Sequence, residues 1–473
     1  MAEFVKMHYL DPNLDSLSGR SYRERWSEDK GTVELEWEFS PPVVPGGAIE
    51  PLRGKVTRLT IGPGSLSVGF SGAEPSDEAG VRACGKVADD IEVLVDVFLT
   101  KAKTTSLYFI FSTGEKGAVR DVPAASPAGG ETLKRLFSGN MMNLYLLIMA
   151  LSFGLFFLLG DVAIFAVLAV QLAALFYSDR IALLLGKVRP TPDRPRVTVV
   201  CVPISTQTKD EVGMLAKGIT AEISDRLEAK LSADSLEGPE ASEAARDVLA
   251  SSGIKSAAEE IRVVTRDVYG LVKDVADRFS LPVPKIAIVN SVADNAAATG
   301  VSPARSSITI TAGSLEDLRD EELSSVVGHE LGHIRGRDSL ILFSATFVLY
   351  VGGLYLWSPL LVDLGLFYYI LIFAIIFSIG KVLETRADTE SAARLGEPQA
   401  LAHALANIGF RQLYAEKNSQ GARLLDWLSF DPHPPIYFRV QRLSKLAKTG
   451  KKVGNTLLVS IRDCVSGFLD ALV

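Results

Sequence analysis

Residues 320–337 read DEELSSVVGHELGHIRGR, and the expected positions of the other site residues follow from this stretch. Its apolar residues recur at helical spacing, and three carboxylates stand at its start, where they suit the positive end of a helix. On such a helix, His329 and His333 are four positions apart and project from one face, about one turn from each other. Two imidazoles at that spacing can bind one metal ion, so the stretch predicts a helix that carries part of a metal site.

Glu330 lies next to His329 on the same helix and is not needed as a ligand. Its carboxylate can instead act as a general base on a water molecule at the metal. Gly328 and Gly332 each lower helix propensity by up to about 1 kcal/mol relative to alanine, which predicts a close approach of backbone or substrate there. The pattern also arises by chance on amphipathic helices, but the chain has only five histidines and two of them fall in this spacing.

A catalytic zinc usually has three protein ligands and a water molecule, so one more ligand is required. Glu384 and Asp388 are also four positions apart and share one face of a predicted helix. We expect Glu384 to bind the metal and Asp388 to accept a hydrogen bond from a ligand imidazole, which would fix its tautomer. Two alternatives stay open: Glu390 could be the ligand, or these carboxylates could be surface charges at a helix end.

Two apolar blocks, Met141–Leu185 and Ser339–Leu383, hold much of the chain's 48% apolar residues. Each is long enough for a helical hairpin that crosses the roughly 30 Å hydrocarbon core twice, which predicts four transmembrane helices. Basic residues flank the outer ends of both blocks, so both termini and the soluble parts are expected in the cytoplasm. The second hairpin returns to the face it left, which brings Glu384 back to the histidine helix. The alternative is a buried helical hairpin in a large soluble core.

The soluble parts divide at these blocks. We predict a β-rich domain over residues 1–120 and a linker over 121–140. A catalytic domain of mixed helix and strand is predicted in two parts, residues 190–338 and 384–473. In the β-rich domain, strands are predicted at Val33–Phe39, Val56–Ile61, Ser65–Phe70, Ile91–Leu99 and Leu107–Ser112. In the catalytic part, strands are predicted at Val197–Pro203, Lys285–Asn290 and Ser307–Thr311, helices at Thr208–Leu231, Ile261–Phe279, Pro398–Leu413 and Tyr437–Lys448, and a solvated excursion at Ser232–Ser252.

Charge and cysteine content exclude other classes. A formal net charge of -7 argues against a nucleic-acid partner, which requires a basic face. The three cysteines are far apart and show no metal-ligand spacing, so neither a disulfide framework nor a cysteine zinc site is indicated.

These residues resemble the HtpX-like and CAAX-prenyl-protease group of membrane zinc metallopeptidases, over roughly residues 140–445. The resemblance rests on His329-Glu-x-x-His333, on Glu384-x-x-x-Asp388 after a hairpin, and on His433-Pro434-Pro435 with Arg439. The two predicted membrane spans that precede the catalytic part favour the HtpX-like branch over the prenyl-protease branch. The resemblance implies an α+β, zincin-like (gluzincin) catalytic domain with one zinc ion per chain. It also implies a prokaryotic cell membrane and a quality-control endopeptidase that hydrolyses peptide bonds of membrane or misfolded proteins at its cytoplasmic face.

The same resemblance implies further site residues. His433 would lie near the cleft and stabilise the oxyanion as a catalytic residue, with Tyr437 as the alternative donor. Asn295, Ala296 and Arg439 would contact substrate, where a peptide can add to a strand edge. Two rival functions remain: a CAAX-type prenyl-protein protease of the same chemistry, and a non-catalytic membrane scaffold that would have no need of the general base.

Overall fold

The structure is a computed structural model that separates into two compact units, Met1–Thr104 and Thr105–Val473. Each unit is described by itself. The structure describes residues 28–29, 32–33, 55–62, 65–71, 106–113, 154–155, 158–203, 219–233, 238–252, 261–356, 366–409, 412–413, 416, 420–449 and 454–472. The predicted linker at 121–140 lies outside these residues.

The first unit contains an antiparallel sheet of order β1-β2-β3-β4. Its strands are β1 (Glu28–Asp29), β2 (Thr32–Val33), β3 (Lys55–Gly62) and β4 (Ser65–Ser71). The strands predicted at Val56–Ile61 and Ser65–Phe70 are confirmed as β3 and β4. Ile91–Leu99 and most of Val33–Phe39 lie outside the described residues.

The second unit begins with a sheet of order β5-β6-β7, all antiparallel, formed by β5 (Ser106–Thr113), β6 (Arg196–Pro203) and β7 (Arg262–Asp267). The sequence assigned Leu107–Ser112 to the N-terminal domain, but β5 pairs with β6 along its whole length. The reason is that both faces of β5 are apolar: Tyr108 and Ile110 enter the main core, whereas Phe109 and Phe111 enter a second core under two helices.

Those two helices are α7 (Ile219–Ala233) and α8 (Gly238–Ser251). The solvated excursion predicted at Ser232–Ser252 is therefore wrong for most of its length. Alanines on one side of α8 are buried against the second core, together with Leu249. Alanine is the best helix former, so a stretch of low hydrophobicity still forms a packed helix here.

The helix predicted over Ile261–Phe279 is two elements, β7 and α9 (Val268–Phe279). Three consecutive β-branched residues, 263–265, favour the strand, and Asp267 then caps the helix by accepting a hydrogen bond from the Gly270 amide at 2.7 Å. The following sheet has the order β8-β10-β9, with β8 (Lys285–Val289) parallel to β10 (Arg305–Thr311) and β9 (Ala296–Ser302) antiparallel to it. β9 is therefore an edge strand.

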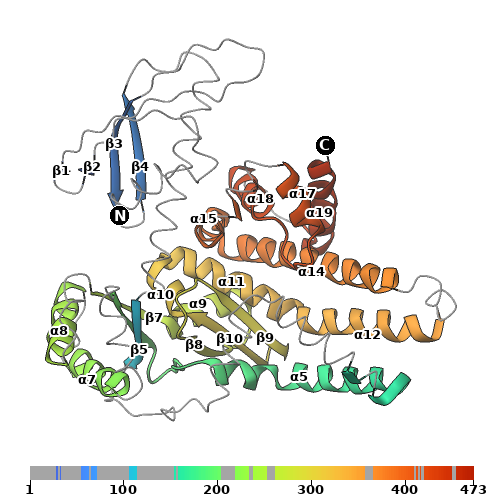
Figure 1. Ribbon diagram of the computed structural model, residues 1–473, viewed down its shortest axis with the longest axis horizontal. Coiled ribbons are helices and arrows are strands. Elements are labelled where there is room, and N and C mark those ends of the chain that lie inside the picture. The colour runs from blue at the N-terminus through green and yellow to red at the C-terminus, as the bar shows by residue number, and fades with distance from the viewer. Residues whose placement is uncertain are drawn as a thin grey trace. The chain divides into compact units, whose positions relative to one another are not determined.

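Helices cover this second sheet (Figure 1). Helix α5 (Ala163–Leu185) contacts all three of its strands, and α11 (Asp320–Gly336) packs on β9 and α9. The chain then continues into α12 (Asp338–Leu356) and returns in α14 (Leu366–Leu395), so the second predicted hairpin is present as two helices. The short elements η2 (Gly160–Val162) and α10 (Ala312–Asp317) precede α5 and α11.

The membrane prediction is supported in part. Among the described residues, one helical stretch, Phe165–Leu184, is long and apolar enough to cross a bilayer, and Asp338–Leu349 is a shorter apolar stretch. Most of the predicted first span, Met141–Gly160, lies outside the described residues. The arrangement of four spans with cytoplasmic termini therefore stays a prediction.

The C-terminal part is helical and packs against α14 and α11. It consists of α15 (Pro398–Ile408), α17 (Gln420–Leu428), α18 (Ile436–Thr449) and α19 (Thr456–Leu472). α15 and α18 confirm the helices predicted at Pro398–Leu413 and Tyr437–Lys448, whereas α17 and α19 were not predicted. The main core contains apolar residues from both sheets and from α9, α11, α15 and α18.

Candidate metal centre

Helix α11 is formed and placed by its own sequence. The backbone amide of Arg319 donates to the Glu322 carboxylate at 3.0 Å, which closes the first turn, and Leu323, Val327 and Leu331 are fully buried in the core. The helix ends at Arg337, whose φ of 55° is left-handed. Because of this anchoring, the histidine-bearing turns have a fixed position relative to the sheet.

Two of the three glycines in this helix, Gly328 and Gly332, allow a second helix to approach it. A Cβ atom at Gly332 would meet the Ala387 backbone at 3.0 Å, and one at Gly328 would meet side chains of Ser391 and Leu395 at 2.7 Å. The close approach predicted at these positions is therefore made by α14. Because α14 packs this closely, its carboxylates reach the histidines.

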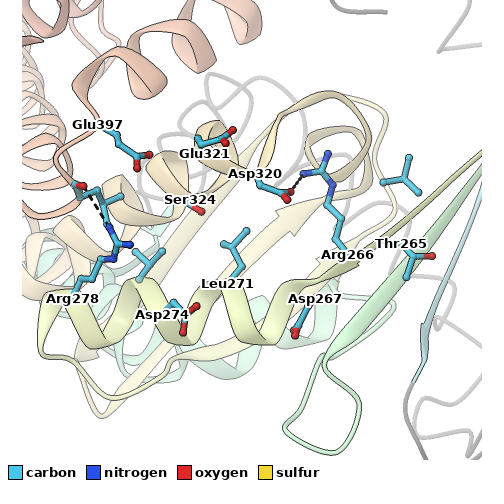
Figure 2. A pocket seen from close by; sticks show the side chains of 13 residues that line it. Thr265, Arg266, Asp267, Leu271, Asp274, Arg278, Asp320, Glu321, Ser324 and Glu397 are labelled. Carbon is cyan, nitrogen blue, oxygen red and sulfur yellow. Dashed lines mark hydrogen bonds and ion pairs between the residues drawn. The ribbon is translucent and has the colours of Figure 1, made fainter. Parts of the chain in front are cut away.

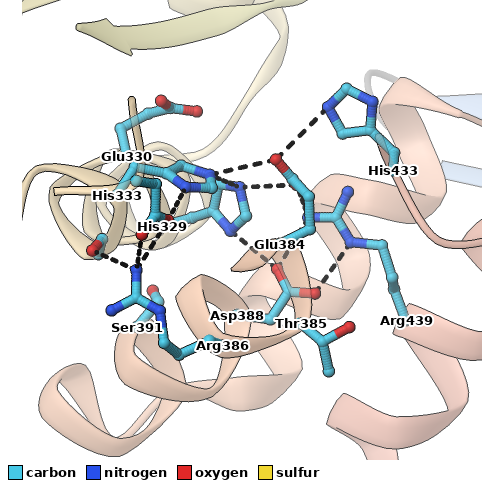
Figure 3. Close-up of polar contacts among 12 residues, drawn as sticks. His329, Glu330, His333, Glu384, Thr385, Arg386, Asp388, Ser391, His433 and Arg439 are labelled. Carbon is cyan, nitrogen blue, oxygen red and sulfur yellow. Dashed lines mark hydrogen bonds and ion pairs between the residues drawn. The ribbon is translucent and has the colours of Figure 1, made fainter. Parts of the chain in front are cut away.

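The side chains of His329, His333 and Glu384 converge on one point (Figure 3). The two Nε2 atoms are 3.1 Å apart, and each lies 3.3 Å from one oxygen of Glu384. In tetrahedral zinc sites, bonds of about 2.0–2.2 Å place neighbouring ligand atoms about 3.3–3.6 Å apart. The buried Oε2 atom of Glu384 has no hydrogen-bond partner among the described residues. The three side chains therefore fit a zinc ion in spacing and donor type.

Each histidine is oriented by a buried carboxylate. His329 Nδ1 lies 2.9 Å from Asp388, the residue expected to accept its hydrogen bond, but the atom forms no hydrogen bond among the described residues. His333 Nδ1 lies 2.7 Å from Asp338, which the sequence interpretation missed, and hydrogen-bonds to it. An arginine holds each carboxylate in turn: Arg439 contacts both Asp388 oxygens at 2.8 and 2.9 Å, and Arg386 contacts both Asp338 oxygens at 2.7 Å. Both ring orientations are thus set by the same kind of carboxylate–arginine pair.

Charge sets the protonation of this cluster. Burial alone would raise the pKa of Asp388 and of Glu384, but Arg439 beside Asp388, and the histidines beside Glu384, outweigh it and lower both pKa values. Burial would lower the pKa of His329 and His333, yet the surrounding carboxylates raise both. The centre therefore attracts positive charge, either as protons or as a metal ion.

Glu330 contacts the sheet rather than the three metal-site side chains. Its Oε2 atom accepts a hydrogen bond from the Ala298 amide of β9 at 2.6 Å. Ala298 is paired in register with Ile308 of β10, and because alternate residues of an edge strand turn their polar groups outward, this amide points away from the sheet. The edge of β9 and Glu330, the predicted general base, are therefore next to each other.

His433 reaches the centre on a fixed loop. Lys381 Nζ donates to the carbonyls of Ser429 and Asp431 at 3.0 and 2.6 Å, and His433 Nδ1 lies 2.7 Å from Asp431. His433 Nε2 is then 3.7 Å from Glu384 Oε1, and the side chain is about half exposed. The Tyr437 hydroxyl instead accepts a hydrogen bond from Trp427 at 3.2 Å.

The remaining predicted residues lie in different surroundings. The Asn295 amide and carbonyl both bond to Thr311, which secures the start of β9, and Ala296 is the first residue of that edge strand. Arg439 is buried against Asp388 and lies 3.5 Å from Glu384. Its position suits orientation of a metal ligand better than the substrate contact that the resemblance implied. Glu390, the alternative ligand, contacts Arg386 at 3.3 Å.

A groove of about 620 Å³ lies elsewhere, between β7, α9 and the start of α11 (Figure 2). Its lining includes none of the metal-centre residues. Arg266 pairs with Asp320 at its rim, and Arg278 donates to the Leu395 carbonyl. The groove therefore has no part in the chemistry of the metal centre.

We expect Asp338→Asn to weaken zinc binding by about 10- to 100-fold, because asparagine cannot hold the His333 ring as a carboxylate does. Zinc affinity measured by competition with a chelating dye checks this. Asp463→Asn is the matched control, since Asp463 also pairs with an arginine, Arg442, at 2.8 Å. Equal zinc affinity in wild type and Asp338→Asn would show that the contact does not orient the ligand.

Two histidines and a glutamate from two helices, with a second glutamate beside them, form the kind of site that metalloproteases have. The model of peptidase family M48 matches residues 263–447, which include all of these residues.

Curated relatives carry the same assignment. A protease HtpX homolog of Polynucleobacter necessarius is 31% identical over 226 residues, 39% of this chain and 75% of the relative. Homologs from Thermococcus kodakarensis and Methylibium petroleiphilum are 32% and 35% identical, over 38% and 37% of this chain and 74% and 72% of those relatives. The chain belongs to the HtpX-like metalloproteases of peptidase family M48.

Proposed function

We propose that this metalloprotease is a zinc endopeptidase of the cell membrane that hydrolyses peptide bonds of membrane or misfolded proteins at the cytoplasmic face. The observation that carries the proposal is the convergence of His329, His333 and Glu384 at zinc-ligand spacing, with Glu330 directly after His329 on the same helix. Zinc bound there would supply Lewis-acid chemistry by polarising the scissile carbonyl and acidifying water.

The chain's own residues perform the proton transfers. Glu330 accepts the proton of the attacking water and passes it to the departing amine, as a positioned carboxylate can. His433 is the candidate donor to the oxyanion, because it is the half-exposed histidine beside Glu384. Asp388 and Asp338, each paired with an arginine, hold the ligand rings in one orientation.

The substrate is proposed to bind as an extended strand along β9. Ala296, Ala298 and Gly300 occupy alternate positions on this edge strand, so their polar groups face outward. A peptide that pairs there lies next to Glu330, which already contacts the Ala298 amide. Main-chain pairing favours unfolded segments over folded proteins, because only an extended chain offers free amides and carbonyls.

The membrane assignment is supported by the surface of α5. Large apolar side chains on this helix are exposed, among them Phe165, Val170 and Phe176. A soluble protein rarely exposes such a continuous apolar surface to water, whereas in a bilayer the same side chains contact lipid tails.

The test follows zinc content and casein cleavage together in purified, detergent-solubilised protein. We expect about one zinc ion per chain, loss of cleavage when a chelator removes it, and recovery when zinc is returned. Retention of cleavage in metal-free protein would overturn the zinc proposal. Zinc binding without cleavage of casein or of a denatured membrane protein would overturn the endopeptidase proposal and favour a scaffold.

A further inference from the structure

The C-terminal helix α19 has an apolar face that the described part of the chain leaves uncovered. At 100° per residue, one third of the helix circumference is apolar along its whole length. We call its exposed residues the α19 stripe: Leu458, Ile461, Val465, Leu469 and Leu472, exposed by 64, 42, 56, 53 and 52%. On one side of the stripe the exposed residues are polar, for example Arg462 and Ser466, and on the other side Leu457 is also exposed, by 42%. The stripe is thus bordered by polar residues along one side.

The buried side of α19 fixes its direction relative to α14. Going along α19, Thr456 contacts Glu390, Ser460 lies 3.4 Å from Thr389, and Cys464 lies 3.1 Å from Thr385. The two helices therefore run antiparallel, and α19 advances toward the N-terminal half of α14. That half, residues 366–380, contains no charged residue.

A second contact joins this region to the apolar half of α14. Phe430, which follows α17, packs against Phe373 and Phe377 with ring centroids 6.2 and 5.7 Å apart. Trp427 of α17 packs against Phe468 of α19 at 6.2 Å. Figure 1 shows α17 and α19 together on one side of α14. Aromatic contacts therefore join α17 to the apolar half of α14 and to the end of α19.

We propose that the lipid bilayer covers the C-terminal part of the α19 stripe, with α19 entering the headgroup and acyl boundary alongside α14 rather than lying flat in the interface. The proposal rests on the proposed membrane location and on the second transmembrane hairpin predicted from the sequence, to which the N-terminal half of α14 belongs. Ile370, Leu371 and Ile375 in that half are themselves exposed, and α19 advances toward them. Burial of apolar side chains in the headgroup and acyl boundary stabilises such a helix at the membrane. The direction of α19 further predicts that insertion deepens from Leu458 toward Leu472.

This placement would fix the metal centre at the membrane surface. Thr385, which contacts Cys464, is the residue after Glu384. Lipid contact of α19 would therefore hold the ligand helix at a constant depth, from which the edge of β9 can receive segments that emerge from the bilayer.

The test uses full-length protein in liposomes, in a background with Cys84, Cys201 and Cys464 replaced by alanine that retains casein cleavage. Single cysteines at Val465 and Ser466 carry a polarity-sensitive fluorophore. These neighbours differ by 100° around the helix, so Ser466 is the matched control. We expect a lipid-borne quencher to act several-fold more strongly at Val465 than at Ser466, an aqueous quencher to show the reverse, and lipid quenching to rise from position 458 to position 472.

Other results would overturn the inference in distinguishable ways. Aqueous quenching at both positions would mean that the stripe faces water. Protection from both quenchers at position 465 would mean protein cover, by a second copy if position 465 cross-links between chains and by another part of the same chain if it does not. A label at Leu371 separates the two proposals: lipid quenching there without lipid quenching at Val465 rejects only the α19 inference, whereas aqueous quenching at Leu371 rejects the membrane assignment of α14.

Discussion

Glu330→Gln should lower the rate of casein cleavage by about 10²- to 10⁴-fold, the usual contribution of a positioned general base. Glutamine has nearly the same shape as glutamate and an oxygen that can still accept the Ala298 hydrogen bond, which is 2.6 Å long in the wild type. It cannot accept a proton from water. The measurement is kcat/KM for a quenched-fluorescence peptide together with zinc content, which we expect to stay at about one ion per chain.

The matched control is Glu321→Gln, an exposed carboxylate in the first turn of the same helix. It removes one negative charge from α11 without touching the metal centre, so cleavage should stay near the wild-type rate. Wild-type kcat/KM in Glu330→Gln would assign the base to another residue. A fall accompanied by loss of zinc would mean that the substitution disturbs the site rather than the proton transfer.

The metal centre could be predicted from the sequence to the extent that it depends on local spacing. His329 and His333 are one turn apart on a helix whose start and apolar face are also visible in the sequence, and the structure confirms that helix. Glu384 and Asp388 were found by the same rule, because α14 continues without interruption from the apolar block into the catalytic part. In both cases one helix holds the relevant side chains on one face.

Residues that act through tertiary contacts could not be identified in this way. Asp338 is five positions after His333, which is not a helical-face spacing, and it reaches the imidazole because α11 ends at Arg337 and the chain turns into α12. Its partner Arg386 looked like a basic residue that flanks a membrane span. Arg439 was expected at substrate because nothing in the sequence shows that it is buried against Asp388.

The errors in secondary structure have a related cause. The alanine-rich residues of α8 carry little hydrophobicity, yet they are buried because small side chains let α7 and α8 pack closely. β7 was included in a helix because apolar residues continue from it into α9, although its β-branched residues and the capping Asp267 mark the boundary. β5 was placed in the wrong unit because pairing with β6, 90 residues later, is not visible in local sequence.

Glu384→Gln should weaken zinc binding by at least about 100-fold, a larger loss than that caused by removing an outer carboxylate. A neutral amide is a poor ligand for zinc, and the change also removes the negative charge that lies 3.3 Å from both imidazole nitrogens. Cleavage should be lost at ordinary zinc concentrations and should return in part when zinc is raised. Zinc affinity by chelator competition and cleavage against zinc concentration are the two measurements.

Glu390→Gln supplies the comparison, because Glu390 is on the same helix, is similarly buried and pairs with Arg386 at 3.3 Å. If Glu384 is the third ligand, Glu390→Gln retains zinc and cleavage, whereas Glu384→Gln does not. The opposite result would make Glu390 the ligand, which requires α14 to turn so that the later carboxylate faces the histidines. Loss of zinc in both variants, with unchanged folding, would mean that the charge of this helix rather than one ligand retains the ion. These outcomes separate coordination by Glu384 from electrostatic attraction because the two glutamates share helix, burial and charge but differ in contact with His329 and His333.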